Sequence, residues 1–266
     1  MAQFMNLGFS FDGLSGADLG YYIVNMDNGS NRLGLNKQIE EEDNNHSTKT
    51  FYGVKLGEFT FTINIVKMPP NHSSYTILEM TEDDINFINN WLLKPKTYKV
   101  FSSDQNRDIY YYAMFTDMDE TRIGTKGYLT LTMRLNAGFA YSSVIHHENV
   151  ITSGELRDIQ IATKSSVDEF VYPDINLIIE KENSNITIIN ETIGESMELT
   201  NLPIGTYICY NEDMKHIDCI ENPTLNMRLH FNGEWLRLLG NSVNNISVIG
   251  DCKIDIYFQN KIAIQH

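Results

Sequence analysis

The sequence predicts a mainly β protein of two domains, and three observations lead to this fold class. Apolar and polar residues alternate strictly in short stretches such as Phe59–Val66 and Gly127–Leu135, and a period of two is typical of half-buried antiparallel strands. Turn-forming Gly, Asn and Ser recur about every eight to twelve residues near the C-terminus, as in compact sandwiches and barrels. Only one segment carries convincing helix signals. We expect an N-terminal β-sandwich or barrel-like domain with one principal helix, followed by a C-terminal β-sandwich.

The first predicted element is a pair of strands joined by a turn. The stretch FSFDGLSGADLGYYIVN begins at Phe9 and ends in a second apolar run. Gly13 and Gly16 allow tight backbone turns between the two runs, and the Asp18 side chain can bond the turn backbone.

The next segment, Asn25–Thr50, is polar and contains the acidic run Glu40, Glu41, Glu42 and Asp43. Like charges repel one another and resist packing, so we expect a solvated loop here. In an assembly, the same run is a candidate arm or lumen-facing loop.

The principal helix begins at Thr81. Thr81 is a candidate N-cap, and Asp84 three residues later gives a pattern like a capping box. Pro95 stops the helix, because proline lacks the backbone donor that a helix interior needs. We predict a helix over residues 81–93, whose apolar face is formed by Ile85, Ile88 and Leu92.

Further strands are predicted at Ile109–Phe115 and Gly127–Leu135. Tyr110, Tyr111 and Tyr112 are consecutive in the first of these, so their side chains must divide between the two faces of the sheet. At least one tyrosine then points away from the core, which favours a subunit interface or a sugar-stacking surface.

The residues between these strands are expected to form a polar connection that contains Asp117, Asp119, Glu120 and Arg122. An Asp-x-Asp pattern can bind a metal ion, but no further ligands stand in register with it. We therefore predict no metal site here.

The domain boundary is expected within Ala137–Ser166, where clear alternation is absent until Ile159. This places an N-terminal domain at residues 1–150 and a C-terminal domain at residues 151–266. His146 and His147 fall in this region and are interpreted as exposed linker residues, because neighbours on an extended chain point to opposite sides. The stretch Asp168–Ile179 then opens the second domain.

The C-terminal domain is expected to contain a strand at Leu225–Phe231, a turn at Asn232–Gly233 and a short strand at about residues 235–238. Another turn at Gly240 and two more short strands follow. Trp235 is interpreted first as a core residue, and it is also the best single candidate for a carbohydrate-stacking side chain.

Composition and motifs exclude several classes of protein. The 266 residues carry a net charge of −15, whereas a nucleic-acid-binding surface needs a basic patch. The three cysteines form no CxxC pair and are expected to be buried thiols. No motif for a catalytic nucleophile, a phosphate-binding loop or a zinc protease occurs. We therefore predict no enzyme activity, no cofactor and no membrane insertion, since no long apolar run and no secretion signal is present.

Two patterns resemble the siphophage distal tail protein family, whose members carry a galectin-like, jelly-roll type C-terminal domain. The opening fits the family pattern at Phe9, Phe11, Gly13, Ser15, Asp18, Gly20 and Val24, although Asp12 and Leu19 replace the usual Asn and Phe. The C-terminal region fits at Gly233, Trp235, Leu236, Leu238, Asn245, Ile246, Val248 and Gly250.

The resemblance implies a structural protein of the tail tip. Its N-terminal domains would form a six-fold ring that joins the tail tube protein to the tail-tip hub, and DNA would pass through the ring without specific binding. Receptor-binding or baseplate proteins would attach outside. The expected location is the distal end of the virion tail, after assembly in the bacterial host cytoplasm.

Two alternative functions are kept. The galectin-like architecture and exposed aromatic residues are also compatible with a carbohydrate-binding module or adhesin that recognises host cell-wall polysaccharide. A polysaccharide-cleaving enzyme of the tail tip is the third hypothesis, because the carboxylate pairs of such enzymes converge only in space.

Overall fold

The computed structural model describes residues 8–26, 37–43, 49–56, 59–70, 76–104, 108–123, 126–151, 156–167, 170–211 and 215–263. These residues divide into two compact units. One unit contains the described residues up to Tyr141 together with Ala263, and the other spans Ser142–Ile262. Each unit has its own large hydrophobic core.

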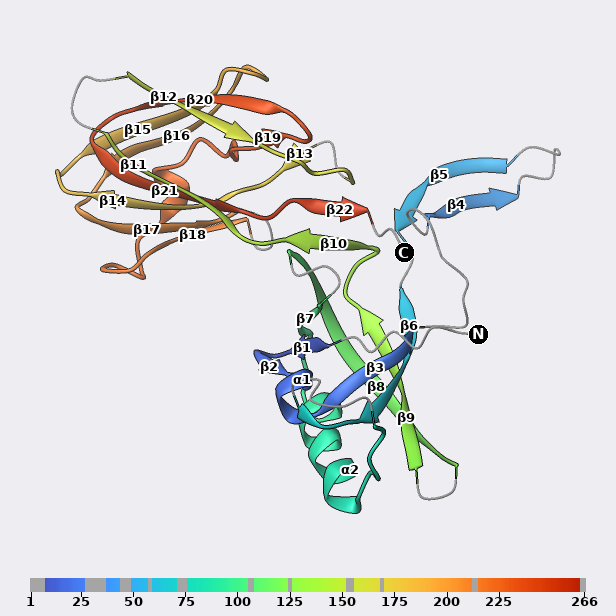
Figure 1. Ribbon diagram of the computed structural model, residues 1–266. Helices are drawn as coiled ribbons and strands as arrows, with labels where there is room; N and C mark the ends of the chain where they lie inside the picture. Colours follow the sequence, from blue (N-terminus) through green and yellow to red (C-terminus); the bar gives the residue numbers. More distant parts are fainter. Residues whose placement is uncertain are drawn as a thin grey trace. The chain divides into compact units, whose positions relative to one another are not determined.

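The first unit is built on an antiparallel sheet with the strand order β2-β1-β7-β8-β9-β6-β3 (Figure 1). Its strands are β1 (Phe9–Phe11), β2 (Leu14–Ser15), β3 (Tyr21–Met26), β6 (Thr60–Lys67), β7 (Lys99–Ser103), β8 (Ile109–Ile123) and β9 (Lys126–Leu135), and β10 (Phe139–Ser142) follows them. The two ends of this order, β2 and β3, do not pair with each other. Among the described residues the sheet is therefore open and no barrel closes.

The predicted helix is confirmed and covers the core face of this sheet. It consists of α2 (Glu82–Ile88) and a π-helical turn, η2 (Asn89–Leu93). Thr81 and Asp84 form the expected capping box. Trp91 and Leu92 are buried with the core phenylalanines, and the Trp91 indole donates to the carbonyl oxygen of Phe11 at 3.1 Å.

The turn predicted after Phe11 folds as one helical turn, α1 (Gly16–Leu19), capped by the Ser15 hydroxyl. Gly20 ends this helix with φ 81°. A Cβ atom at Gly20 would lie 2.5 Å from the carbonyl oxygen of Met68, so both the conformation and the close approach require glycine.

The prediction of a loop at Asn25–Thr50 is wrong for the part of this segment that the structure describes. The acidic run lies in β4 (Lys37–Asp43), which pairs with β5 (Lys49–Leu56) as a separate two-stranded sheet. A hairpin exposes both faces to solvent, so charged side chains can alternate with exposed apolar ones without packing in a core.

The polar connection expected at Asp117–Arg122 is also wrong, because these residues continue strand β8 and pair with β9. A strand with one solvated face accepts polar residues as readily as a loop does. The region Ala137–Ser166, which is expected to contain the domain boundary and shows little alternation, holds β10, β11 (Ile145–Ile151) and β12 (Leu156–Ala162).

The second unit is a β-sandwich. One sheet has the order β11-β21-β14-β17-β18 and the other has the order β12-β20-β15-β16. Alternate residues of both sheets are buried in one shared core. The remaining strands of this unit are β13 (Phe170–Val171), β14 (Asp174–Ile179), β15 (Ser184–Asn190), β16 (Glu195–Leu202), β17 (Gly205–Tyr210), β18 (His216–Cys219), β19 (Leu238–Leu239), β20 (Val243–Ile249) and β21 (Cys252–Phe258). The last strand, β22 (Lys261–Ala263), pairs with β10.

The strand predicted at Leu225–Phe231 is wrong. Met227–Leu229 form a short 3-10 helix, η3, and Phe231 makes only an isolated bridge to Leu199. The Asn226 side chain accepts from the backbone of Arg228, which favours the turn. The short strand expected near Trp235 is confined to β19, and Trp235 itself precedes it.

No described helix is both long enough and apolar enough to cross a bilayer.

Candidate functional site

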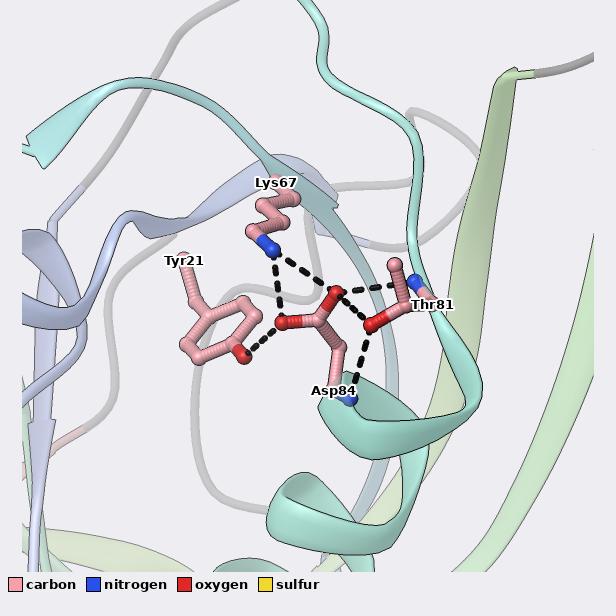
Figure 2. Close-up of polar contacts among 4 residues, drawn as sticks. All are labelled: Tyr21, Lys67, Thr81 and Asp84. Carbon is pink, nitrogen blue, oxygen red and sulfur yellow. Dashed lines mark hydrogen bonds and ion pairs between the residues drawn. The ribbon is translucent and has the colours of Figure 1, made fainter.

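A polar cluster fixes the N-terminus of α2 to the sheet of the first unit (Figure 2). The Asp84 carboxylate accepts from the Tyr21 hydroxyl at 2.8 Å and from the Lys67 ammonium at 2.7 Å to each oxygen. Thr81 donates to it through its backbone N–H and its hydroxyl. Because Tyr21 and Lys67 are register partners in β3 and β6, one carboxylate joins two strands and a helix.

The electrostatics of this cluster favour an ionised Asp84. Burial alone would raise the pKa of Asp84, but the hydrogen bonds from Lys67, Thr81 and Tyr21 outweigh it and hold that pKa well below its usual range. Burial first, and then the bond to Asp84, raises the pKa of Tyr21 above its usual range. The cluster has the character of an internal anchor, since Asp84 and Tyr21 are both buried.

Two edges of the first unit's sheet are candidate assembly surfaces. Strand β3 is the last strand of the order, so one of its edges has no partner in the described sheet. Strand β8 pairs with β7 at Tyr111–Ala113 and also pairs with β10, and among the described residues the register of residues 117–123 is with β9 alone. Uncovered edges present a row of backbone donors and acceptors to another chain.

The face of this sheet opposite the core is polar in part, beside a small apolar cluster of Tyr22, Val66 and Met68. The strand register forms two rows across β8, β9 and β6. One row contains Asp117, Thr132 and Thr62 in this order, and the other contains Asp119, Thr130 and Asn64. The Thr130 hydroxyl donates to the Asn64 side chain at 2.8 Å. We call Thr60, Thr62, Asn64, Asp117, Asp119, Thr130 and Thr132 the polar face. Arg134 lies opposite Thr60 at its end.

The three consecutive tyrosines divide between the faces of β8. Tyr111 packs against the core, 6.4 Å from the Phe101 ring, and its burial raises its pKa. By strand alternation, Tyr110 and Tyr112 belong to the other face. Tyr112 makes an edge contact with Tyr141 at 4.9 Å, so it lies in a small aromatic cluster of its own.

The acidic run of β4 is engaged with its partner strand. Glu41 forms an ion pair with Lys49, and Glu42 accepts from the Tyr52 hydroxyl at 2.8 Å. Ile39, Phe51 and Tyr52 on this hairpin are all more than 60% exposed. An isolated two-stranded sheet is marginal in water, so this hairpin is a candidate contact for another chain.

Trp235 is half-buried and packs against the core of the second unit, with its ring 4.9 Å from Phe231 in an edge contact. The Lys215 ammonium lies 3.7 Å from the centre of the Tyr172 ring and 5.6 Å from that of Trp235. Burial, and then the nearby Arg237, lowers the pKa of Lys215. No local sequence pattern predicts this contact, because Lys215, Tyr172 and Trp235 lie far apart along the chain.

Chemistry of an active site is not apparent in the part of the chain that the structure describes. No group of three His, Cys, Asp or Glu side chains there could hold a metal ion. The cysteines are free and buried, and burial raises the pKa of Cys209 and of Cys252 to about 12. Such thiols are poor nucleophiles.

Comparison with known proteins identifies the family. Residues 4–137 match the family described as phage tail protein N-terminal domain, and residues 139–258 match the phage tail C-terminal domain. None of the curated proteins matches the sequence.

The fold is similar to solved phage structures. The Dit (gp 19.1) protein of phage SPP1, described as a paradigm of the hub adsorption apparatus in phages that infect Gram-positive bacteria, covers 97% of this chain and 100% of its own at a TM-score of 0.65 and 11% identity. A chain of the activated phage P2 baseplate with Ca has a TM-score of 0.54 at 10% identity, covering 98% of this chain and 100% of its own. A chain of the same activated baseplate with Sr has a TM-score of 0.52 at 10% identity, covering 97% of this chain and 99% of its own. The resemblance to siphophage distal tail proteins is thereby confirmed, and the chain belongs to the phage tail protein family.

Proposed function

We propose that this protein forms a ring at the distal end of a phage tail, with the first unit building the ring and the second unit projecting from it. The observation that carries the proposal is a pair of strand edges on one sheet that no described strand is shown to cover, the outer edge of β3 and residues 117–123 of β8. A sheet with two different free edges can pair head to tail with copies of itself, and such an interface closes when the rotation between copies closes.

The edges belong to a continuous four-stranded part of the sheet, β8-β9-β6-β3. In the ring, residues 117–123 of one copy pair with β3 of the next. Each contact satisfies backbone groups that would otherwise promote aggregation. We propose that the ring contains six copies of the chain, the number that the resemblance to distal tail proteins implies.

The polar face lines the bore. Its groups are hydroxyls, an amide and two carboxylates, with Arg134 at one end. Phosphate contacts from lysine and arginine supply most non-specific DNA affinity. A bore with few cations and several carboxylates lets DNA pass without binding it. The acidic strand β4 faces solvent or the bore and acts through its charge.

The ring would join the tail tube protein on one side to the tail-tip hub on the other, and receptor-binding or baseplate proteins would attach outside. It would assemble in the bacterial host cytoplasm. The role is structural, not enzymatic. Incubation of the purified protein with host cell-wall polysaccharide should release no soluble sugar, whereas steady release abolished by one carboxylate substitution would identify a hydrolase.

The ring is tested by mass in solution combined with amide hydrogen exchange. We expect a closed oligomer of six chains. Peptides that cover residues 21–26 and 117–123 should gain protection in the oligomer relative to the dilute monomer. Peptides that cover β18, an edge strand of the second unit, serve as the control and should not change. An oligomer in which the two sheet edges exchange as in the monomer would refute strand pairing, and a chain that stays monomeric at high concentration would refute the ring.

A further inference from the structure

The outer face of the five-stranded sheet in the second unit carries a second organised surface. Residues that alternate with the buried core positions of β11, β21 and β14 lie in rows across the strands. Register places His146, Tyr257 and Asp174 in one row, Glu148, Asp255 and Asn176 in the next, and Val150, Lys253 and Ile178 in the third. Adjacent rows are two residues apart along each strand, or about 6.6 Å.

The first row carries a stacked aromatic pair at the edge of the sheet, where β11 is the last strand of the order. The His146 and Tyr257 rings are stacked with their centres 4.5 Å apart and their planes within 2°. Asp255 holds the imidazole in place, with its Oδ1 2.9 Å from Nε2 of His146. Each ring covers one face of the other, but the His146 side chain lies on the edge strand and is 43% exposed, so the pair is open to solvent at its His146 end. An exposed ring face of this kind can contact the apolar C–H face of a sugar.

The third row opens into a groove of about 350 Å³. Val150, Ile178 and Cys252 give it apolar walls, and charged residues surround them. This volume lies near the lower end of the range of about 300–1,000 Å³ that is typical of small-molecule sites. It suits one sugar unit, and its apolar walls suit a methyl-bearing substituent.

The charges of this face select against anionic ligands. Lys253 is paired with Glu148 at 2.6 Å, and Lys181 is paired with Asp251. Both lysines of the groove are thus neutralised, while Glu180 also lines it. A phosphate-bearing polymer would meet net negative charge here.

We propose that this face, which we call the outer-sheet groove and define by His146, Tyr257, Glu148, Asp255, Asn176, Val150 and Ile178, binds an uncharged glycan that carries N-acetyl groups. The exposed His146 end of the aromatic pair takes the flat side of one sugar. The acidic and amide row accepts and donates hydrogen bonds to hydroxyl groups. The groove lies two rows, or about 13 Å, from the aromatic pair, so the acetyl methyl that enters it belongs to a sugar further along the glycan chain.

This glycan site differs from the one that the sequence indicated. Trp235 packs on Phe231 and on the sandwich core, and it belongs to none of these rows. The proposal does not depend on ring formation, since every residue of the outer-sheet groove lies in the second unit. The mass measurement that tests the ring and the affinity measurement that tests glycan binding can therefore give independent results.

Titration calorimetry of the full chain tests the specificity. The probes are the N-acetylglucosamine trisaccharide, the glucose trisaccharide and a glycerol phosphate oligomer. We expect measurable binding of the first, weaker binding of the second because it lacks the acetyl groups, and none of the third. Preference for the glycerol phosphate oligomer, or no heat from the acetylated trisaccharide at millimolar concentration, would overturn the proposal.

Matched variants locate the site. Val150→Glu places a carboxylate at the groove, and Val243→Glu makes the same change on β20 of the other sheet. The two valines are 56% and 55% exposed. We expect Val150→Glu to weaken binding of the acetylated trisaccharide by about tenfold or more, and Val243→Glu to leave it unchanged. Tyr257→Ala, checked for an unchanged unfolding transition, should also lose binding. Wild-type affinity in both Val150→Glu and Tyr257→Ala, or an equal loss in Val243→Glu, would refute this location.

Discussion

At the scale of single residues, Asp84 connects more of the first unit than any other side chain in Figure 2. Its carboxylate receives bonds from β3, from β6 and from the residue that caps its own helix. Removal of the Asp84 carboxylate takes away the ion-pair partner of the Lys67 ammonium, whose side chain is only 27% exposed. Loss of one charged hydrogen-bond partner costs about 1.5–3 kcal/mol, and an unpaired buried charge costs more.

We predict that Asp84→Ala lowers the free energy of unfolding by about 1.5–3 kcal/mol. Denaturant titration at neutral pH measures the change. Asp83→Ala is the matched control, because Asp83 lies in the same helical turn but is exposed. Equal effects of the two substitutions would mean that dipole interaction, not the cluster, is what Asp84 contributes.

The same carboxylate predicts a specific pH dependence. The folded-state pKa of Asp84 lies below its unfolded value, so the unfolded chain binds the proton more tightly. Its contribution to stability is therefore complete above about pH 5 and declines as the pH falls through the unfolded value near 3.9 towards the lower folded value. Unfolding free energy measured from pH 6 to pH 2 should fall less steeply in Asp84→Ala than in the wild type. Parallel profiles would contradict this assignment.

Trp235 predicts an intermediate loss. A fully buried aromatic side chain contributes about 3–5 kcal/mol relative to alanine, but Trp235 is only half-buried. We expect Trp235→Ala to cost about 1–3 kcal/mol, whereas Leu229→Ala, at a site 76% exposed in the neighbouring turn, should change stability by less than about 0.5 kcal/mol. Unchanged stability together with lost glycan binding would instead make Trp235 a ligand platform.

At the scale of elements, the sequence anticipated those whose signals are local. The helix at residues 82–93 has a cap, an apolar face and a proline after its end, and each acts within a few residues of the chain. The register that brings Lys67 to Asp84 and His146 to Tyr257 arises from strand pairing over long separations. The short-range pattern of apolar and polar residues does not specify which of these distant side chains come into contact.

Two predicted loops are strands in the structure, because a polar composition has more than one structural cause. The acidic run at Glu40–Asp43 and the polar stretch at Asp117–Arg122 both lie in strands with solvated faces. Conversely, Leu225–Phe231 alternates without forming a strand, and its Leu229 stands in solvent. The alternating pattern shows which side chains are apolar, whereas pairing with a neighbouring strand decides whether a segment forms the backbone hydrogen bonds of a sheet.

The β4–β5 hairpin predicts a separation between stability and assembly. Phe51 is 64% exposed there, whereas Phe61 is 7% exposed in β6. We expect Phe51→Ser to leave the unfolding transition within about 0.5 kcal/mol of the wild type, and Phe61→Ser to lower stability by about 3–5 kcal/mol. Oligomer mass should fall in Phe51→Ser if the hairpin contacts another copy. A large loss of stability in Phe51→Ser would show that this ring packs within its own chain.

At the scale of the whole molecule, the two units carry different surfaces. The first has free sheet edges and the polar face, and the second has the outer-sheet groove. Their separate cores allow these surfaces to be altered independently. The net charge of −15 does not say by itself which surface meets DNA. That question needs substitutions that change the charge equally at two places.

The final prediction separates the polar face from the acidic hairpin as the lining of the bore. Asp117→Lys with Asp119→Lys, and Glu41→Lys with Glu42→Lys, change the net charge of the chain by the same amount. In phage particles we expect the first pair to slow DNA ejection, because lysines in a bore bind phosphates, and the second pair to have a smaller effect. The difference should shrink as salt rises, since screening shortens the reach of the added charges to about 10 Å at 0.1 M. Equal slowing by both pairs would mean that the bore is not lined by the polar face, and slowing by the β4 pair alone would assign the bore to the hairpin.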